Sequence, residues 1–361
     1  MALPDALLDV SWSLQFVPGD SLRMSSLQAL VSGTEAHAAS PTQLQSLAQE
    51  CCQHISIQDP VYRDELNDER EKTGQLRECA FSQLWPYSWA TSAQIHDRQS
   101  IGLLIETRYQ KTTYQVVLLG NVSGNGENAC PVSLILFKAA PSHVKHIVNW
   151  LNFRFNLPSP AQLRLPPEIV LHGCSRFLDT LSASWTPEQS QDDALRQATL
   201  RQVIGSLKLT LTISNTTETD IAGKLRTVDF DVPSETVDGL LRRARQTHSG
   251  GLAASTAFLD ELANAIHEKT GLRLPLSASL PLQTAQSNTD PALERPLKVS
   301  KITCAAFAIT VDGKLKFARK PIESAEVVGY QETLIRAANW ELLEVVRAEA
   351  EKRGARRDED G

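Results

Sequence analysis

Hydrophobic and polar residues alternate in several short runs of the chain, and this period of two is typical of half-buried β-strands. The first run covers residues 10–16, where Trp12, Leu14 and Phe16 are separated by polar residues. Three further strands are predicted at 101–109, 114–120 and 132–138. After residue 203 the alternation returns, with an apolar row formed by Leu207, Leu209, Leu211 and Ile213 and a second row formed by Val228, Phe230 and Val232.

Between these runs the apolar residues recur at helical spacing. Helices are predicted near 42–54, from a Pro141-Ser142 cap to Phe155, and from Pro166-Pro167 to Leu181. A short helix should begin at Thr186, and two more should cover 234–246 and 255–269. A long C-terminal helix has a predicted buried stripe of Leu334, Ile335, Ala338, Leu342, Val345 and Val346. The acidic segment 59–78 reads as a solvated helix or loop, and 277–296 as a loop.

Runs of strands and runs of helices are therefore segregated along the chain. This order is typical of an α+β fold with antiparallel sheets and is not that of a parallel, doubly wound sheet. Because 361 residues exceed one ordinary core, we expect two lobes. Each would contain a mainly antiparallel sheet with helices packed on one face. The predicted boundary separates an N-terminal domain, 1–199, from a C-terminal domain, 200–361.

The segment 299–317 carries the most information about function. Two β-rich runs flank Asp312-Gly313, a dipeptide typical of a two-residue hairpin turn. Lys314 and Lys316 should share one face of the hairpin, while Leu315 and Phe317 share the other. A cationic cluster surrounds the turn and consists of Lys298, Lys301, Lys314, Lys316, Arg319 and Lys320. Such a surface suits docking, although charged strands also serve simply to prevent aggregation.

Composition narrows the classes of protein. The chain is 42% apolar and 22% charged with a net charge of −6, so nucleic-acid binding would need a local basic patch. No basic leader precedes the first acids, and the apolar runs are too short to span a bilayer. We therefore expect a soluble intracellular protein without a membrane contact, and scattered cysteines that stay reduced.

A search for catalytic motifs yields no candidate site. Neither a phosphate-binding glycine loop nor a nucleophile elbow is present. His143 and His146 are spaced to share one helical face, but we expect them to be exposed polar positions and not metal ligands. Cys174 falls on an apolar stripe, where a reactive thiolate is disfavoured. The sequence thus predicts no enzyme, cofactor, metal or small-molecule substrate. An unrecognised transferase or hydrolase, with a deep polar pocket, stays open as an alternative.

Three segments together resemble the fungal branch of the centromere protein L family. The first is the opening strand Ser11–Leu14. The second runs from Pro131 to Leu181, where an apolar strand leads into a helix with Trp150-Leu151 and Phe155-Asn156, followed by a proline-broken linker and a second helix. The third is the hairpin, in which Ile302, Cys304 and Phe307 precede Gly313–Lys316.

This resemblance implies a two-lobed α+β protein in which each lobe is a curved, mainly antiparallel sheet. It also implies a non-enzymatic subunit of the constitutive inner kinetochore, located in the nucleus at the centromere. Such a protein would heterodimerise through its C-terminal domain with a centromere protein N-like partner. With other inner-kinetochore subunits, the pair would link centromeric chromatin to the kinetochore for chromosome segregation. On the hairpin we assign partner contact to Ile302, Cys304, Phe307, Ile309, Leu315 and Phe317. Whether the chain forms a homodimer when alone stays open.

The alternative from another class is a direct nucleic-acid-binding protein. In this hypothesis the curved sheet and the lysine-rich hairpin grip the phosphate backbone. The contact residues would be Lys301, Lys314, Lys316, Arg319 and Lys320. The two hypotheses are compatible if DNA contact is secondary to the partner complex.

Overall fold

The computed structural model describes residues 2–18, 27, 30–31, 39–58, 72–86, 100–120, 132–182, 198–213, 227–247, 254–272, 274, 297–318 and 328–356. The chain divides into two compact units. The first unit comprises Leu3–Leu163 and Arg347–Gly361, and the second comprises Arg164–Val346. The predicted domain boundary between residues 199 and 200 stays a prediction.

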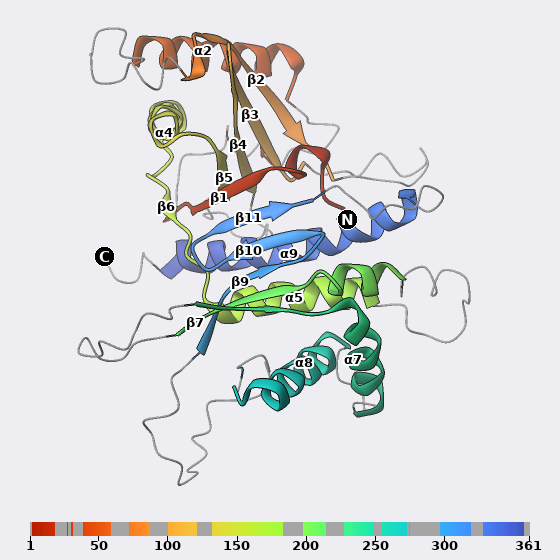
Figure 1. The fold of residues 1–361 in the computed structure, drawn as a ribbon. Helices are drawn as coiled ribbons and strands as arrows, with labels where there is room; N and C mark the ends of the chain where they lie inside the picture. Colours follow the sequence, from red (N-terminus) through yellow and green to blue (C-terminus); the bar gives the residue numbers. More distant parts are fainter. Residues whose placement is uncertain are drawn as a thin grey trace, which may run out of the picture. The chain divides into compact units, whose positions relative to one another are not determined.

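The first unit is an antiparallel sheet with helices. Its strands are β1 (Ser11–Phe16), β2 (Leu76–Leu84), β3 (Gly102–Tyr109), β4 (Thr113–Gly120) and β5 (Val132–Lys138), in the order β2-β3-β4-β5-β1. A two-residue strand, β6 (Ala161–Gln162), also pairs with β1. The helices are α2 (Pro41–Gln58) and α4 (Pro141–Phe155), besides a short 3-10 turn, η1 (Asp5–Leu7). Figure 1 shows this sheet with both helices.

Aromatic and aliphatic side chains of α2, α4 and the sheet form the core of the first unit. Trp150 of α4 is fully buried and lies edge-on to Phe81, with ring centroids 5.4 Å apart, and to Phe155 at 5.6 Å. Around it pack Cys51 and Ile55 from α2 and the inward residues of the strands. The predicted strands β3, β4 and β5 supply this core, and β2, which the sequence did not predict, adds Phe81.

The second unit also consists of antiparallel strands and helices. Its strands are β7 (Lys208–Ile213), β8 (Thr227–Asp231), β9 (Leu297–Thr303), β10 (Phe307–Thr310) and β11 (Lys314–Phe317), in the order β11-β10-β9-β7-β8. Its helices are α5 (Pro167–Ser182), α7 (Ser234–Thr247) and α8 (Ala254–Thr270). The long helix α9 (Val328–Arg356) belongs to this unit up to Val346. Figure 1 shows α7 beside α8.

The α+β class and the antiparallel pairing predicted from the sequence are confirmed. Helices α5, α7 and α8 lie within one or two residues of their predicted bounds. Gly271 ends α8 with a φ of +73°, and its amide donates to the carbonyl of His267 (2.8 Å). This is the left-handed termination expected of a C-terminal glycine.

Four expectations were wrong. Leu76–Leu84 is strand β2, although its acidic start suggested a solvated helix or loop. Residues 198–204 are helical, so the strand begins at Lys208 and not near Val203. The run before Asp312 is two strands, β9 and β10, and not one. On α9, Leu334 and Val345 of the predicted stripe are only partly buried, whereas the polar Asn339 is fully buried. The loop 277–296 and the helix expected from Thr186 lie outside the described residues.

Candidate interaction surface

The β10–β11 hairpin differs from the predicted turn. Ile309 pairs with Leu315, so a three-residue loop, Val311–Gly313, joins the strands. Gly313 has a φ of +74°, and its amide donates to the carbonyl of Thr310 at 3.1 Å. Asp312 is not left-handed, as a two-residue turn of the primed type would require. The hairpin therefore uses the three-residue form with a glycine in the left-handed region.

The apolar face of the hairpin is buried within the chain. Ile302, Ile309 and Leu315 lie opposite one another across β9, β10 and β11 and are almost fully buried. Phe307 packs against Phe177 of α5, with ring centroids 4.7 Å apart. Phe317 pairs with Phe307 and is fully buried. These residues form the core of the second unit, and their contact with a partner stays a prediction.

Cys304 is the sixth residue of the predicted partner contact. It follows β9, and its amide donates to the carbonyl of Phe307 at 2.8 Å. The side chain is half-buried by exposed area, yet its sulfur is enclosed enough that burial raises the pKa of the thiol to about 12. The thiol is therefore neutral at physiological pH and suits packing better than nucleophilic chemistry.

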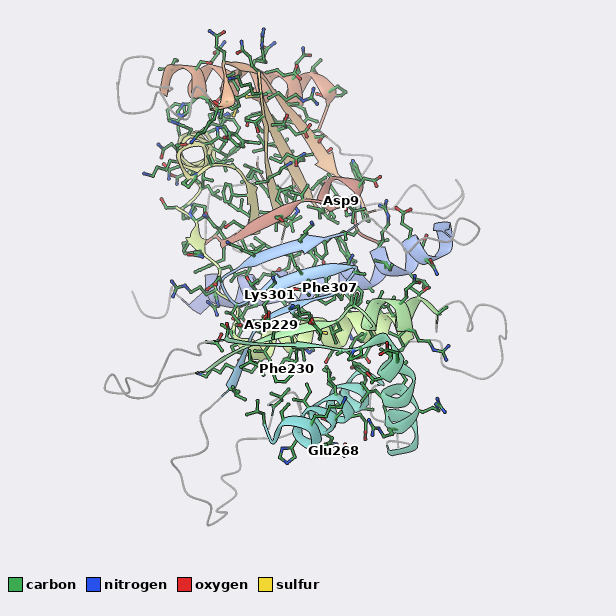
Figure 2. The ribbon with its side chains drawn as sticks, viewed as in Figure 1. Asp9, Asp229, Phe230, Glu268, Lys301 and Phe307 are labelled. Carbon is green, nitrogen blue, oxygen red and sulfur yellow. The ribbon has the colours of Figure 1, made fainter. Side chains whose placement is uncertain are left out.

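The opposite face of this sheet carries lysines. Lys301, Lys314 and Lys316 are exposed, and Lys298 of β9 is exposed as well. Lys301 lies opposite Thr210 of β7 on one side and opposite Thr310 of β10 on the other. The strand neighbours of this lysine are therefore threonines and not other charged residues. Figure 2 marks Lys301 on β9 and Phe307 on β10. Arg319 and Lys320 lie outside the described residues. The predicted division of the hairpin into a lysine face and an apolar face is what the structure shows.

Strand β8 adds acidic residues to this lysine face. Lys208 of β7 reaches Asp231 (Nζ to Oδ1, 3.4 Å) and Asp229 (Nζ to Oδ2, 3.5 Å). The hydroxyl of Thr210 donates to Asp229 at 2.7 Å. This hydrogen bond, followed by the charge of Lys208, lowers the pKa of Asp229, while Asp231 and then Asp229 raise the pKa of Lys208.

The prediction for His143 was wrong. His143 is 3% exposed, not an exposed polar position. Its Nε2 lies 2.7 Å from the hydroxyl of Thr107, and its Nδ1 lies 3.1 Å from the hydroxyl of Tyr109. Burial, with a smaller effect of His146, lowers the pKa of His143 to about 4, so the imidazole is neutral at pH 7. The hydroxyls of Thr107 and Tyr109, both on β3, offset the cost of burying the imidazole of His143. The periodicity of the sequence does not show which strand lies beside His143, so it could not predict these contacts.

The remaining candidates from the sequence are the Cys174 thiol, a metal site and a small-molecule pocket, each considered over the described residues. Cys174 is buried, and burial raises the pKa of its thiol. Among the described residues, no group of three His, Cys, Asp or Glu side chains is arranged to hold a metal ion. A cavity of about 10 Å³ in the second unit is lined mainly by apolar residues such as Leu178, Leu200 and Phe258. A void of this size admits about one water and no metabolite. Within the described helices, none has the length and apolarity needed to cross a membrane.

Comparison with known families decides the assignment. The model of the family described as Centromere protein L matches residues 21–351. This chain belongs to the centromere protein L family. A search of curated proteins finds no match. The matched residues include parts of both units, so the assignment rests on most of the chain and not on the hairpin alone.

Family membership carries three statements about the protein. It is a kinetochore protein of the centromere, it is nuclear, and it takes part in chromosome segregation. Other kinetochore subunits are its expected class of partner. The family is structural and is not known for enzymatic activity. The resemblance drawn from three sequence segments is therefore confirmed at the level of the family.

Proposed function

We propose that the chain is a non-enzymatic structural subunit of the constitutive inner kinetochore. It heterodimerises with a centromere protein N-like partner through residues 200–361, and the pair links centromeric chromatin to the rest of the kinetochore. The observation that carries this proposal is the family match over residues 21–351. Supporting it, the sheet of the second unit has helices on its apolar face and leaves a lysine face and an outer strand to other molecules.

Affinity purification of the tagged full-length chain from cells tests the role. Centromeric chromatin proteins and a centromere protein N-like subunit should be recovered together with it. Recovery without any centromeric protein would contradict the proposal. Co-expression with the recovered partner, followed by light scattering after size exclusion, should then give a one-to-one complex. The same measurement on the isolated chain decides between a monomer and a homodimer.

A second candidate function is direct nucleic-acid binding. The observation that favours it is the shared exposed face of Lys301, Lys314 and Lys316, which suits a phosphate backbone. Arg319 and Lys320 complete the predicted contact set. Since each phosphate contact releases a counterion, affinity should fall steeply with salt concentration.

Charge reversal tests the second candidate. The double variant Lys314→Glu with Lys316→Glu should abolish a gel shift of duplex DNA. Lys145→Glu is a matched control, because Lys145 is exposed on α4. An unchanged shift in the double variant would refute direct binding by this face while leaving the kinetochore role intact.

A further inference from the structure

Strand β8 is the outermost strand of the second unit's sheet. Among the described strands it pairs only with β7, with Lys208 opposite Asp231 and Thr212 opposite Thr227. An outer strand presents unpaired backbone N–H and C=O groups, which can template a further strand. Figure 2 marks Asp229 and Phe230 on this strand.

The hydrogen-bond pattern identifies which backbone groups point outward. The amide of Val232 donates to the carbonyl of Leu207 at 3.0 Å. In an antiparallel pair, successive residues bond alternately toward one neighbour and the other. Phe230 and Val228 therefore bond toward β7, as Val232 does. The N–H and C=O groups of Asp229 and Asp231 point to the open edge.

The two faces of β8 have different chemistry. Asp229 and Asp231 are exposed on one face, whereas Val228 and Phe230 are half-buried on the other. The neighbouring strand β7 shows which sequence complements this pattern. It places Lys208 opposite Asp231, Leu209 opposite Phe230 and Leu211 opposite Val228. A strand on the open edge meets the same alternation of carboxylate and apolar side chains.

The same pattern disfavours a second copy of this chain at the edge. Two β8 strands paired antiparallel, with their apolar faces together, bring the carboxylates of one copy beside those of the other. Like charges placed opposite each other destabilise a strand pair. A single lysine, Lys208, already contacts both carboxylates of its own chain at 3.4 and 3.5 Å, and it cannot compensate two more. The edge thus selects against self-pairing.

We propose that β8 docks an extended segment of another protein in which lysine or arginine alternates with apolar residues. Its basic side chains lie opposite Asp229 and Asp231, and its apolar side chains extend the layer of Val228 and Phe230. This inference rests on the proposed role of residues 200–361 in partner binding and names the edge and the chemistry of the partner. Main-chain hydrogen bonds hold the segment, and the charge pattern gives its specificity.

Asp229→Pro in the full-length chain is the sharpest test. Its N–H points outward, so proline removes a donor for the incoming strand and leaves the β7 ladder intact. The probe is a synthetic peptide of alternating lysine and valine, and the control is the same peptide with glutamate for lysine. We expect the lysine peptide to bind the wild-type chain at least tenfold more tightly than the glutamate peptide. Asp229→Pro should lose this binding at an unchanged thermal midpoint.

A second variant keeps the test decisive if the proline variant does not fold. Asp229→Lys combined with Asp231→Lys leaves the backbone edge intact and should reverse the preference toward the glutamate peptide. Amide exchange followed by NMR gives an independent readout. On adding the lysine peptide to the wild-type chain, the amides of Asp229 and Asp231 should slow at least tenfold, while those of Val228 and Phe230 stay as they were.

Two outcomes would overturn the inference: equal binding of both peptides, or retained lysine-peptide binding by Asp229→Pro. Its failure is separable from failure of the proposed function. If the tagged Asp229→Pro chain still recovers its centromeric partners in full, the kinetochore role stands and the β8 edge is not the docking site. If even the wild-type chain recovers none, the role itself is wrong.

Discussion

The two units use the same kind of antiparallel sheet, but they bury it differently. In the first unit, consecutive residues of the central strands are buried, as in Val116–Leu119 of β4 and Leu134–Phe137 of β5. In the second unit, burial alternates: β11 shows exposed Lys314 and Lys316 between buried Leu315 and Phe317. Burial of consecutive residues means that both faces of the central strands are enclosed.

This difference in burial indicates which strands serve mainly the core and which also offer a surface to other molecules. A strand enclosed on both faces reads as a continuous apolar run, whereas a strand with one wet face reads as an alternation. The first sheet therefore has little room for polar substitution in its centre. The second sheet offers a whole face of lysines and threonines, and an acidic edge at β8, to other molecules.

The largest expected effect comes from a charge placed in a strand of the first unit. Leu118 of β4 is fully buried in the core cluster. Leu118→Lys leaves an unpaired charge there, which should lower the free energy of unfolding by about 4 kcal/mol or more. Urea denaturation followed by tryptophan fluorescence measures it. The matched control is Lys301→Val, on the open face of the second sheet, which should change stability by less than about 0.5 kcal/mol. If both variants lost a similar amount of stability, the two units would not differ in how they bury their strands.

A smaller effect concerns the neutral histidine of the first unit. The pKa of His143 is lowered from 6.5 to about 4 in the fold, so the unfolded chain binds the extra proton first as pH falls. Its stabilising contribution is complete above pH 6.5 and is lost as pH drops toward 4. At roughly 1.4 kcal/mol per pKa unit, the loss is roughly 3 kcal/mol.

The measurement is the free energy of unfolding of His143→Gln and wild type between pH 7 and 4. The variant should lose this part of the pH dependence. His172→Gln, on the exposed side of α5, is the control and should follow the wild-type curve. A His143→Gln curve parallel to that of the wild type would show that this imidazole titrates normally.

The hairpin glycine of the second unit should have an intermediate effect. Gly313→Ala forces a side chain into a φ of +74°, and we expect a loss of about 1–2 kcal/mol. Gly239→Ala is the matched control, because Gly239 is exposed on α7 and a Cβ there meets nothing within 4 Å. Helix propensity predicts that the control gains up to about 1 kcal/mol. Thermal unfolding of both variants should therefore shift in opposite directions.

Sequence periodicity predicted the elements whose apolar residues face one core. Strand β5 and helix α5 are examples, since Val132–Lys138 and Pro167–Ser182 are bounded by clear turn and proline signals. It missed β2, because the exposed outer residues of a terminal strand resemble those of a solvated loop: Arg77 and Glu78 are exposed there. Hydrophobic and polar residues alternate along a strand only where one face of the strand is buried. The outer strand β2 buries few residues, so its sequence shows little alternation.

The candidate surface was predictable only in part. The split of Lys314 and Lys316 from Leu315 and Phe317 follows from local alternation and needs no tertiary knowledge. The environment of His143 and the docking edge of β8 depend on which strand lies beside which. Strand order comes from contacts between residues far apart in the chain, such as Thr210 with Lys301. No window of sequence contains that information.

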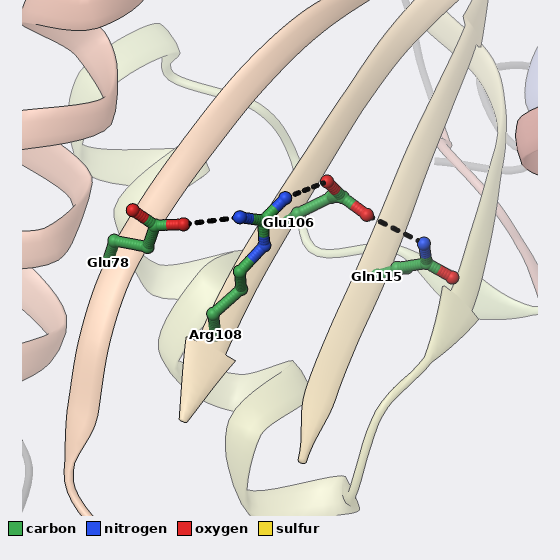
Figure 3. A network of polar contacts seen from close by, with 4 residues as sticks. All are labelled: Glu78, Glu106, Arg108 and Gln115. Atoms are coloured by element: carbon green, nitrogen blue, oxygen red, sulfur yellow. Dashed lines mark hydrogen bonds and ion pairs between the residues drawn. The ribbon is translucent and has the colours of Figure 1, made fainter. Parts of the chain in front are cut away.

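The smallest expected effect on stability comes from the exposed ion pairs of the two units. In the first unit, Arg108 of β3 donates to Glu78 of β2 at 2.6 Å and to Glu106 at 3.4 Å, and Gln115 donates to Glu106 at 2.8 Å (Figure 3). About half of the Arg108 and Glu78 side chains is exposed, so solvent screens the pair. The counterpart in the second unit is Lys208 with Asp229 and Asp231.

A double-mutant cycle of Arg108→Ala and Glu78→Ala should give a coupling energy of about 0.2–1 kcal/mol that shrinks in 1 M salt. The same cycle on Lys208→Ala and Asp229→Ala should give no larger value, since both groups are also exposed. A coupling well above 1 kcal/mol at β8 would mean that the aspartates hold the sheet together. They would then be poor candidates for recognition, because a residue kept for docking contributes to binding and only weakly to folding.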